Sequence, residues 1–137
     1  MDYNSDHLNK FTRVYGQSEV IFEEGDASSE MYIVHSGKVK IYRDSEGAEV
    51  EIDTIGPGEF FGEMALVDFA PRSASARAIE DNTALVALDK KKFLFLVSHH
   101  PIFALVIMHQ LCQKIRSLSE AALAVEKSQP IKQEYPK

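Results

Sequence analysis

The chain is poor in cysteine, in basic charge and in long apolar runs. Its 137 residues include one cysteine, Cys112, which excludes an internal disulfide framework and a cysteine-ligated cluster and suits a reducing compartment. We expect Cys112 to be a small buried hydrophobe. Lys and Arg number 15 against 21 Asp and Glu, so the net charge is −6 and the basic face of a nucleic-acid-binding protein is not expected. The composition therefore predicts no direct nucleic-acid partner.

No segment has the pattern of a signal peptide or of a membrane span. The polar stretch 2–9 has no basic start followed by an apolar run, and the apolar stretches 93–97 and 102–108 are too short to cross a bilayer. We therefore expect a cytoplasmic protein with no membrane partner. The length and the hydrophobic content of 45% suit one globular domain with one core.

Short alternating strands separated by turn residues occupy residues 15–88, a pattern that predicts a β-roll similar to a jelly roll. Glu46-Gly47 is typical of a hairpin turn. In the strand that follows this turn, the acidic residues are expected to face solvent, while Val50 and Ile52 are expected to face the core. Strands are expected at 31–34, 38–41, 49–53, 75–79 and 84–88.

After Leu88 the pattern becomes helical over 89–127. Asp89 suits the N-cap of a short helix, and Pro101 breaks the chain before a long second helix. In that second helix, apolar residues recur at alternating spacings of three and four, as in a coiled-coil seam: Met108, Leu111, Ile115, Leu118, Ala122 and Val125. We expect the helix over 102–127 to join two copies in a parallel homodimer; packing on its own β-roll is the alternative. A polar, disordered tail is expected over 128–137.

The segment 60–75 combines a glycine turn, a carboxylate and an arginine. Gly62, followed by Glu63 and by small or apolar residues, can form one tight helical turn whose free N–H groups point at an anion. Arg72 adds a planar cation for phosphate oxygens, and Ser73 adds a hydroxyl and a backbone N–H. Glu63 would repel a phosphate unless it accepts a hydrogen bond from a sugar hydroxyl. Together these residues predict a ligand with both a sugar and a phosphate.

The segments 61–66 and 71–75 resemble the phosphate-binding cassette of cyclic nucleotide-binding domains. Such domains occur in the catabolite activator protein family, in regulatory subunits of cAMP-dependent protein kinase and in cyclic-nucleotide-gated channels. The resemblance spans 11–125 and implies a mainly β fold, a β-roll with a short cassette helix and C-terminal helices, the last one long. It implies no cofactor, and a ligand that is cAMP or, as the alternative, cGMP. Ser73 follows the arginine here, as it does in the catabolite activator proteins.

Carried over by position, the resemblance assigns roles within the cassette. Glu63 is implied to accept the ribose 2′-hydroxyl, and Arg72 to pair with the exocyclic phosphate oxygens. Backbone N–H groups are implied to come from Gly62, Ala65 and Ser73. Met64 and Leu66 are implied to be apolar packing around the cassette. The full set of implied ligand-binding residues is Phe61, Gly62, Glu63, Met64, Ala65, Leu66, Arg72, Ser73 and Ala74.

The last helix supplies base contacts in this family, sometimes from the partner subunit, which implies contacts at Leu118 and Ser119. Ser119 stands where a family serine reaches across the dimer. Leu118 departs from the pattern, since the catabolite activator protein has a hydroxyl residue there.

Catalysis and metal binding are not indicated by the remaining residues. No Ser or Cys lies in a nucleophile elbow. The five histidines lack the His-x-His spacing of a cupin metal site: His7, His35, His99, His100 and His109. Two functions remain open, a ligand-gated regulatory domain and a ligand-independent dimerisation or interaction module with a degenerate β-roll. No DNA-binding, kinase or channel segment follows residue 125, so we expect an unknown effector protein to carry the output. Whether the chain is a stand-alone protein or an excised domain stays open.

Overall fold

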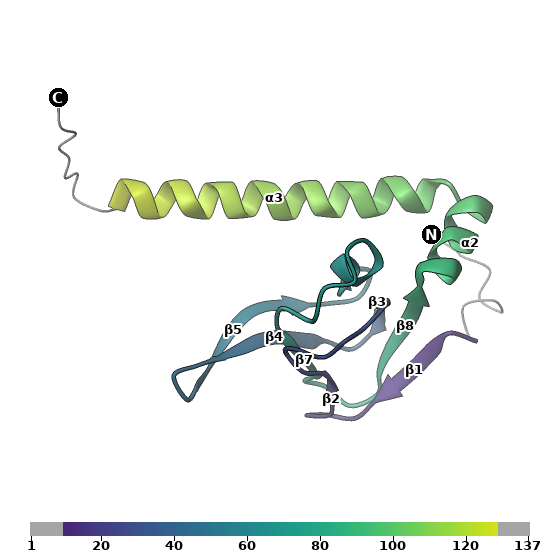
Figure 1. Cartoon of the computed structure of the whole chain (residues 1–137), viewed down its shortest axis with the longest axis horizontal. Coiled ribbons are helices and arrows are strands. Elements are labelled where there is room, and N and C mark those ends of the chain that lie inside the picture. The colour runs from purple at the N-terminus through teal and green to yellow at the C-terminus, as the bar shows by residue number, and fades with distance from the viewer. Residues whose placement is uncertain (1–9, 129–137) are drawn as a thin grey trace. The chain divides into compact units, whose positions relative to one another are not determined.

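Eight strands form two four-stranded antiparallel sheets in the computed structural model, which describes residues 10–128 (Figure 1). The strands are β1 (Thr12–Tyr15), β2 (Val20–Phe22), β3 (Glu30–Ser36), β4 (Val39–Ser45), β5 (Ala48–Ile55), β6 (Phe60–Phe61), β7 (Ser75–Ala78) and β8 (Thr83–Asp89). One sheet has the order β1-β8-β3-β6 and the other the order β2-β7-β4-β5. This arrangement confirms the predicted mainly β fold with a β-roll.

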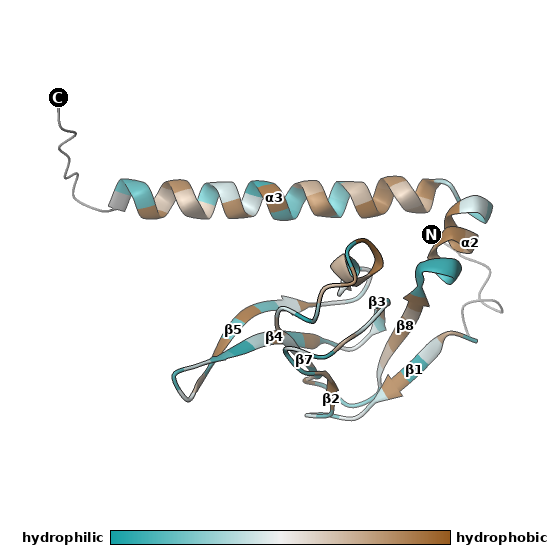
Figure 2. Ribbon diagram, in the orientation of Figure 1, coloured by the Kyte–Doolittle hydropathy of each residue, from teal (hydrophilic) through white to brown (hydrophobic). Residues whose placement is uncertain are grey.

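The core draws side chains from both sheets. Tyr32, Val34 and Leu85 come from the first sheet, and Val39 and Ala76 come from the second. Strand β8 is buried from its first residue to Leu88, and it is among the most hydrophobic parts of the ribbon (Figure 2). The sequence forms strands here because β-branched and apolar residues fill a surface that is covered on both faces.

Strands β4 and β5 are joined by the predicted hairpin turn at Glu46 and Gly47, where φ is 52° and 82°. Both values lie in the left-handed region that a type I′ turn requires. The prediction that Val50 and Ile52 face the core is wrong, since they are 48% and 52% exposed. β5 is an edge strand that is exposed along its length until Ile55.

The hairpin also contains a register shift between Ile41 and Tyr42. Ile41 pairs with Asp53 and Tyr42 with Glu51, so Ile52 has no partner of its own on β4. Such a bulge inverts the alternation between the two halves of a strand. Burial does not follow the alternation on either side of the shift, because every residue from Ala48 to Thr54 is exposed and β5 forms the edge of its sheet.

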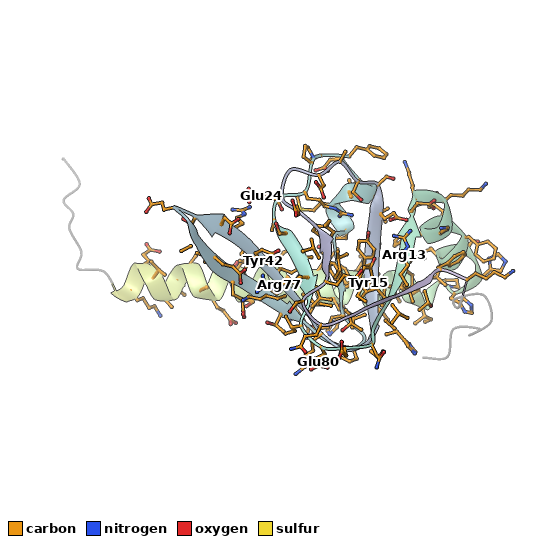
Figure 3. The ribbon with its side chains drawn as sticks, turned by 90° about the horizontal axis from the view of Figure 1, so that it is seen from below. Arg13, Tyr15, Glu24, Tyr42, Arg77 and Glu80 are labelled. Carbon is orange, nitrogen blue, oxygen red and sulfur yellow. The ribbon has the colours of Figure 1, made fainter. Side chains whose placement is uncertain are left out.

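A charged clasp lies across three strands of the second sheet. The Glu49 carboxylate on β5 accepts hydrogen bonds from Arg77 Nη1 and Nη2 of β7 at 2.5 and 2.8 Å. It also accepts one from Lys40 Nζ of β4 at 2.6 Å. Hydrogen bonds from Arg77 and then from Lys40 lower the pKa of the Glu49 carboxyl to about 2. The Arg77 guanidinium also lies 4.7 Å from the centroid of the Tyr42 ring, and both side chains are labelled in Figure 3.

The chain divides into two units, Met1–Pro101 and Ile102–Lys137. The first ends with helix α2 (Lys90–His99), which Asp89 caps as predicted, its Oδ1 accepting the Lys92 N–H at 2.8 Å. Within residues 10–128 no single helix is long and apolar enough to span a membrane; α2 and α3 satisfy the length and composition criteria only when counted together.

The second unit contains helix α3 (Ile102–Ser128), so the long helix predicted after Pro101 is present. Hydrophobic and hydrophilic positions alternate along it (Figure 2). Cys112 lies on α3 and is exposed, so the prediction of a buried hydrophobe is wrong. The tail expected over 128–137 lies, after Ser128, outside the described residues.

Candidate ligand-binding site

A single helical turn follows strand β6, as the glycine and the acidic residue predicted. The 3₁₀ helix η1 (Glu63–Leu66) begins after Gly62, whose φ of 75° and ψ of 14° lie in the left-handed region. A Cβ on Gly62 would lie 2.7 Å from Arg72 Nη1 and 3.5 Å from the Glu30 carbonyl oxygen. Both the backbone conformation and the approach of Arg72 therefore require glycine at this position.

Arg72 returns from the loop after η1 and is 6% exposed. Its Nη1 donates to the Gly62 carbonyl at 3.2 Å, and its Nη2 donates to the Glu30 carbonyl at 2.7 Å and to Ser28 Oγ. The Arg72 backbone is tied to the turn between β2 and β3, because its N–H donates to the Asp26 carbonyl at 2.9 Å. Main chain and side chain thus hold the guanidinium between the cassette and the start of β3.

An aromatic cluster lies against the guanidinium. The Arg72 Cζ is 4.0 Å from the ring centroid of Phe22 and 5.7 Å from that of Tyr32. Phe61 completes the cluster, with ring centroids 5.2 Å from Tyr32 and 5.9 Å from Phe22. Cation–π attraction of this kind strengthens when the cation is removed from water.

The charge of Arg72 has no hydrogen-bonded carboxylate among residues 10–128. The Glu30 carboxylate is engaged elsewhere, since Arg13 donates to both of its oxygens at 3.0 and 2.8 Å. Burial lowers the pKa of Arg72, although the group stays a cation at ordinary pH. Its Nε is buried and has no hydrogen-bond partner in the described part of the chain. Such a group is suited to an anion that brings both a charge and an acceptor.

The other predicted cassette residues differ in their exposure. Phe61, Ala65, Leu66 and Ala74 are buried. Glu63 is half-buried in the first turn of η1.

Met64 and Ser73 lie on the outside of the cassette. The implied packing role of Met64 is wrong, because Met64 is 60% exposed on the outer side of the single turn. Ser73 is exposed, and its carbonyl accepts a hydrogen bond from Arg43 Nε at 2.7 Å. Leu118 and Ser119 lie on α3, in the second unit, so the implied base contacts stay predictions.

Sequence reasoning missed Ser28, Glu30 and Phe22, which surround Arg72. Ser28 and Glu30 belong to the turn after Gly25 and to the start of β3, and Phe22 ends β2. No local motif marks them, because the contacts that matter join segments far apart in the sequence. Among residues 10–128, no three His, Cys, Asp or Glu side chains gather in a group that could hold a metal ion.

The model of the cyclic nucleotide-binding domain matches residues 12–100, and the chain belongs to this family. The chain is 42% identical over 105 residues to the cyclic AMP receptor protein of Thermus thermophilus, over 76% of this chain and 48% of that protein. It is 42% identical over 82 residues to the type II regulatory subunit of cAMP-dependent protein kinase from Drosophila melanogaster, over 60% of this chain and 22% of that protein.

A solved structure shows the same fold. The crystal structure of the Thermus thermophilus catabolite activator protein superposes with a TM-score of 0.74 at 36% identity, over 89% of this chain and 58% of that one. The chain therefore spans about half, or less, of the length of the curated relatives it matches. These matches confirm the resemblance on which the cassette was first identified.

Proposed function

We propose that this chain binds a cyclic nucleotide at Arg72 and the η1 turn and serves as a regulatory domain without catalysis of its own. The observation that carries the proposal is the buried guanidinium of Arg72, whose Nε has no partner among the described residues. A phosphate would supply a hydrogen-bonded countercharge and the acceptor that Nε lacks among the described residues. Membership of the cyclic nucleotide-binding family supports this choice of anion.

The neighbouring groups suit the rest of such a ligand. The first turn of η1 presents backbone N–H groups beside Gly62, and Glu63 stands half-buried at that turn. A carboxylate next to an anion site suits a sugar hydroxyl, because it can accept the hydrogen bond that a hydroxyl donates. We assign Glu63 to the ribose and Arg72, with Ser73, to the phosphate.

We favour cAMP over cGMP as the ligand. Two of the similar proteins carry cAMP in their names, the Thermus receptor protein and the Drosophila kinase subunit. Ser73 after the arginine is also the residue that the resemblance associates with catabolite activator proteins.

Isothermal titration with cAMP and with cGMP tests the proposal. Arg72→Ala should weaken binding by roughly 10- to 100-fold, because charge-assisted bonds contribute about 1.5–3 kcal/mol each. The matched control is Arg77→Ala, because Arg77 lies outside the cassette and pairs with Glu49. The cAMP affinity of this variant should stay within about twofold of that of the wild type. Absence of heat with either nucleotide for the wild-type protein would refute the proposal. Tighter binding of cGMP would refute only the preference for cAMP.

We also propose that α3 joins two copies of the chain. Along this helix, apolar side chains of the coiled-coil seam are exposed, including Met108 at 58%, Ile115 at 63% and Leu118 at 71%. Sedimentation should show a dimer that Ile115→Glu dissociates and that Gln113→Glu, a charge on an exposed polar position, leaves intact. A wild-type protein that stays monomeric at every concentration would contradict the dimer.

In the regulatory function, nucleotide binding shifts the conformation of the cassette and of α3 for an effector protein to recognise. Hydrogen exchange with and without cAMP is expected to show added protection at η1 and a change along α3. A dimer that takes up no nucleotide would instead favour the ligand-independent interaction module.

A further inference from the structure

Ser28 lies in the turn between β2 and β3 and makes two hydrogen bonds through one oxygen. Its Oγ accepts from Arg72 Nη2 and, at 3.2 Å, from the backbone N–H of Glu30. The second bond orders the turn locally and places Oγ beside the Glu30 carbonyl, which accepts from the same Nη2 at 2.7 Å. Both N–H groups of Nη2 are thereby directed at the segment 28–30.

This arrangement fixes the plane of the guanidinium. The five N–H groups of arginine lie in one plane, so two acceptors at Nη2 and the Gly62 carbonyl at Nη1 leave little freedom of rotation. The Phe22 ring, 4.0 Å from Cζ, contacts one face of the plane. In the resulting orientation Nε is the buried donor left without a partner in the described chain.

Ser28 is the one side-chain acceptor in this set, because Glu30 and Gly62 use backbone carbonyls. It is also uncharged. A carboxylate in its place would orient the guanidinium but would neutralise it, and the attraction for an anion would fall. A hydroxyl orients Arg72 and leaves its charge for the ligand.

We propose that Ser28 is a positioning residue for Arg72: a neutral acceptor that fixes the orientation of the guanidinium for the phosphate of the cyclic nucleotide. The proposal rests on the proposed function. It assigns the orientation of the anion-binding guanidinium to a hydroxyl outside the cassette.

Titration of three variants with cAMP tests the effect on binding. Ser28→Ala should weaken binding about tenfold, since one hydrogen bond to a charged group is lost. Ser28→Thr keeps the hydroxyl and should restore most of the affinity. Ser29→Ala removes the hydroxyl of the next residue, which is exposed, and should leave affinity within about twofold of the wild type. Equal affinity of Ser28→Ala and wild type would overturn the proposal.

A double-mutant cycle separates positioning from general support of the fold. Arg72→Lys keeps the charge but has no planar fork to orient. Ser28→Ala should therefore cost no further cAMP affinity in the Arg72→Lys background. If Ser28 acted only by supporting the structure of the turn, the loss of affinity would be the same in both backgrounds. An unchanged loss would refute the positioning role.

A readout without ligand distinguishes this inference from the proposed function. In ¹⁵N spectra of the nucleotide-free protein, the Arg72 guanidinium should give separate Nη signals in the wild type and in Ser28→Thr, because rotation is hindered. The signals should merge in Ser28→Ala. Merged signals in the wild type would refute the positioning of Arg72 even if cAMP binds. Separate signals in a protein that binds neither nucleotide would refute the proposed function and leave the orientation of Arg72 by Ser28 supported.

Discussion

Gly62→Ala perturbs the proposed nucleotide site by one added carbon atom. The added Cβ would lie 2.7 Å from Arg72 Nη1 and 3.5 Å from both Arg72 Cζ and the Glu30 carbonyl oxygen. The backbone at Gly62 resists change because it caps η1 in a left-handed conformation. The guanidinium is thus expected to move away from Gly62 and to lose the hydrogen bond from Nη1 to the Gly62 carbonyl. A phosphate would then meet it in the wrong orientation.

The expected loss divides into two parts that different measurements report. The left-handed conformation costs an L-residue about 1–2 kcal/mol, and this cost falls on the folded state with or without ligand. Displacement of Arg72 removes a charge-assisted interaction, worth about 1.5–3 kcal/mol, from ligand binding. We therefore expect a modest loss of stability together with roughly a 10- to 100-fold loss of cAMP affinity.

Gly58→Ala is the matched control for this substitution. Gly58 has a φ of 84°, in the same left-handed region, but a Cβ built on it meets no atom within 4 Å. It should show the same stability loss in urea denaturation and an unchanged affinity in calorimetry. If Gly62→Ala binds cAMP as tightly as Gly58→Ala, the reasoning that Arg72, held against the Gly62 backbone, binds the phosphate is wrong.

Three further predictions concern the stability of the β-roll and of α2. Gly37→Ala should cost roughly 2–4 kcal/mol in urea denaturation, because its Cβ would lie 2.7 Å from the buried Thr83 Cα at a φ of 85°; a loss under about 1 kcal/mol would contradict this. Asp89→Ala removes the cap on Lys92 N–H and should lower the free energy of unfolding by about 1 kcal/mol, and Asp89→Asn should recover most of it. Glu49 has a pKa lowered from 4.5 to about 2, so the stability it contributes is present above pH 4.5 and is lost as the pH falls towards 2; Glu49→Gln should flatten that part of an acid titration, and an unchanged profile would refute the clasp.

The sequence predicted what local patterns determine. Alternation and turn residues located most strands, and Asp89 marked the start of α2 because capping depends on residues three positions apart. The cassette from Gly62 to Arg72 was identified because its chemistry is contained within one short segment. Its roles in binding stay proposals.

Contacts between distant segments were beyond such patterns. Ser28 approaches Arg72 only because the β2–β3 turn packs against the cassette. The exposure of Val50 and Ile52 follows from the position of β5 at the edge of its sheet, with both faces exposed up to Thr54, which the residues of β5 alone do not reveal. The exposure of Met64 similarly depends on which side of η1 faces the rest of the roll.

Arg72 is a buried cation to which no carboxylate is hydrogen-bonded among the described residues. Removing a charge of this kind from water costs several kcal/mol even after relaxation. Three hydrogen bonds, to Ser28, Glu30 and Gly62, and the contact with the Phe22 ring offset part of this cost in the ligand-free protein. In the proposed function, a phosphate would meet a guanidinium that is already desolvated, already oriented and still charged. A guanidinium held in this way is better suited to binding an anion than to stabilising the fold.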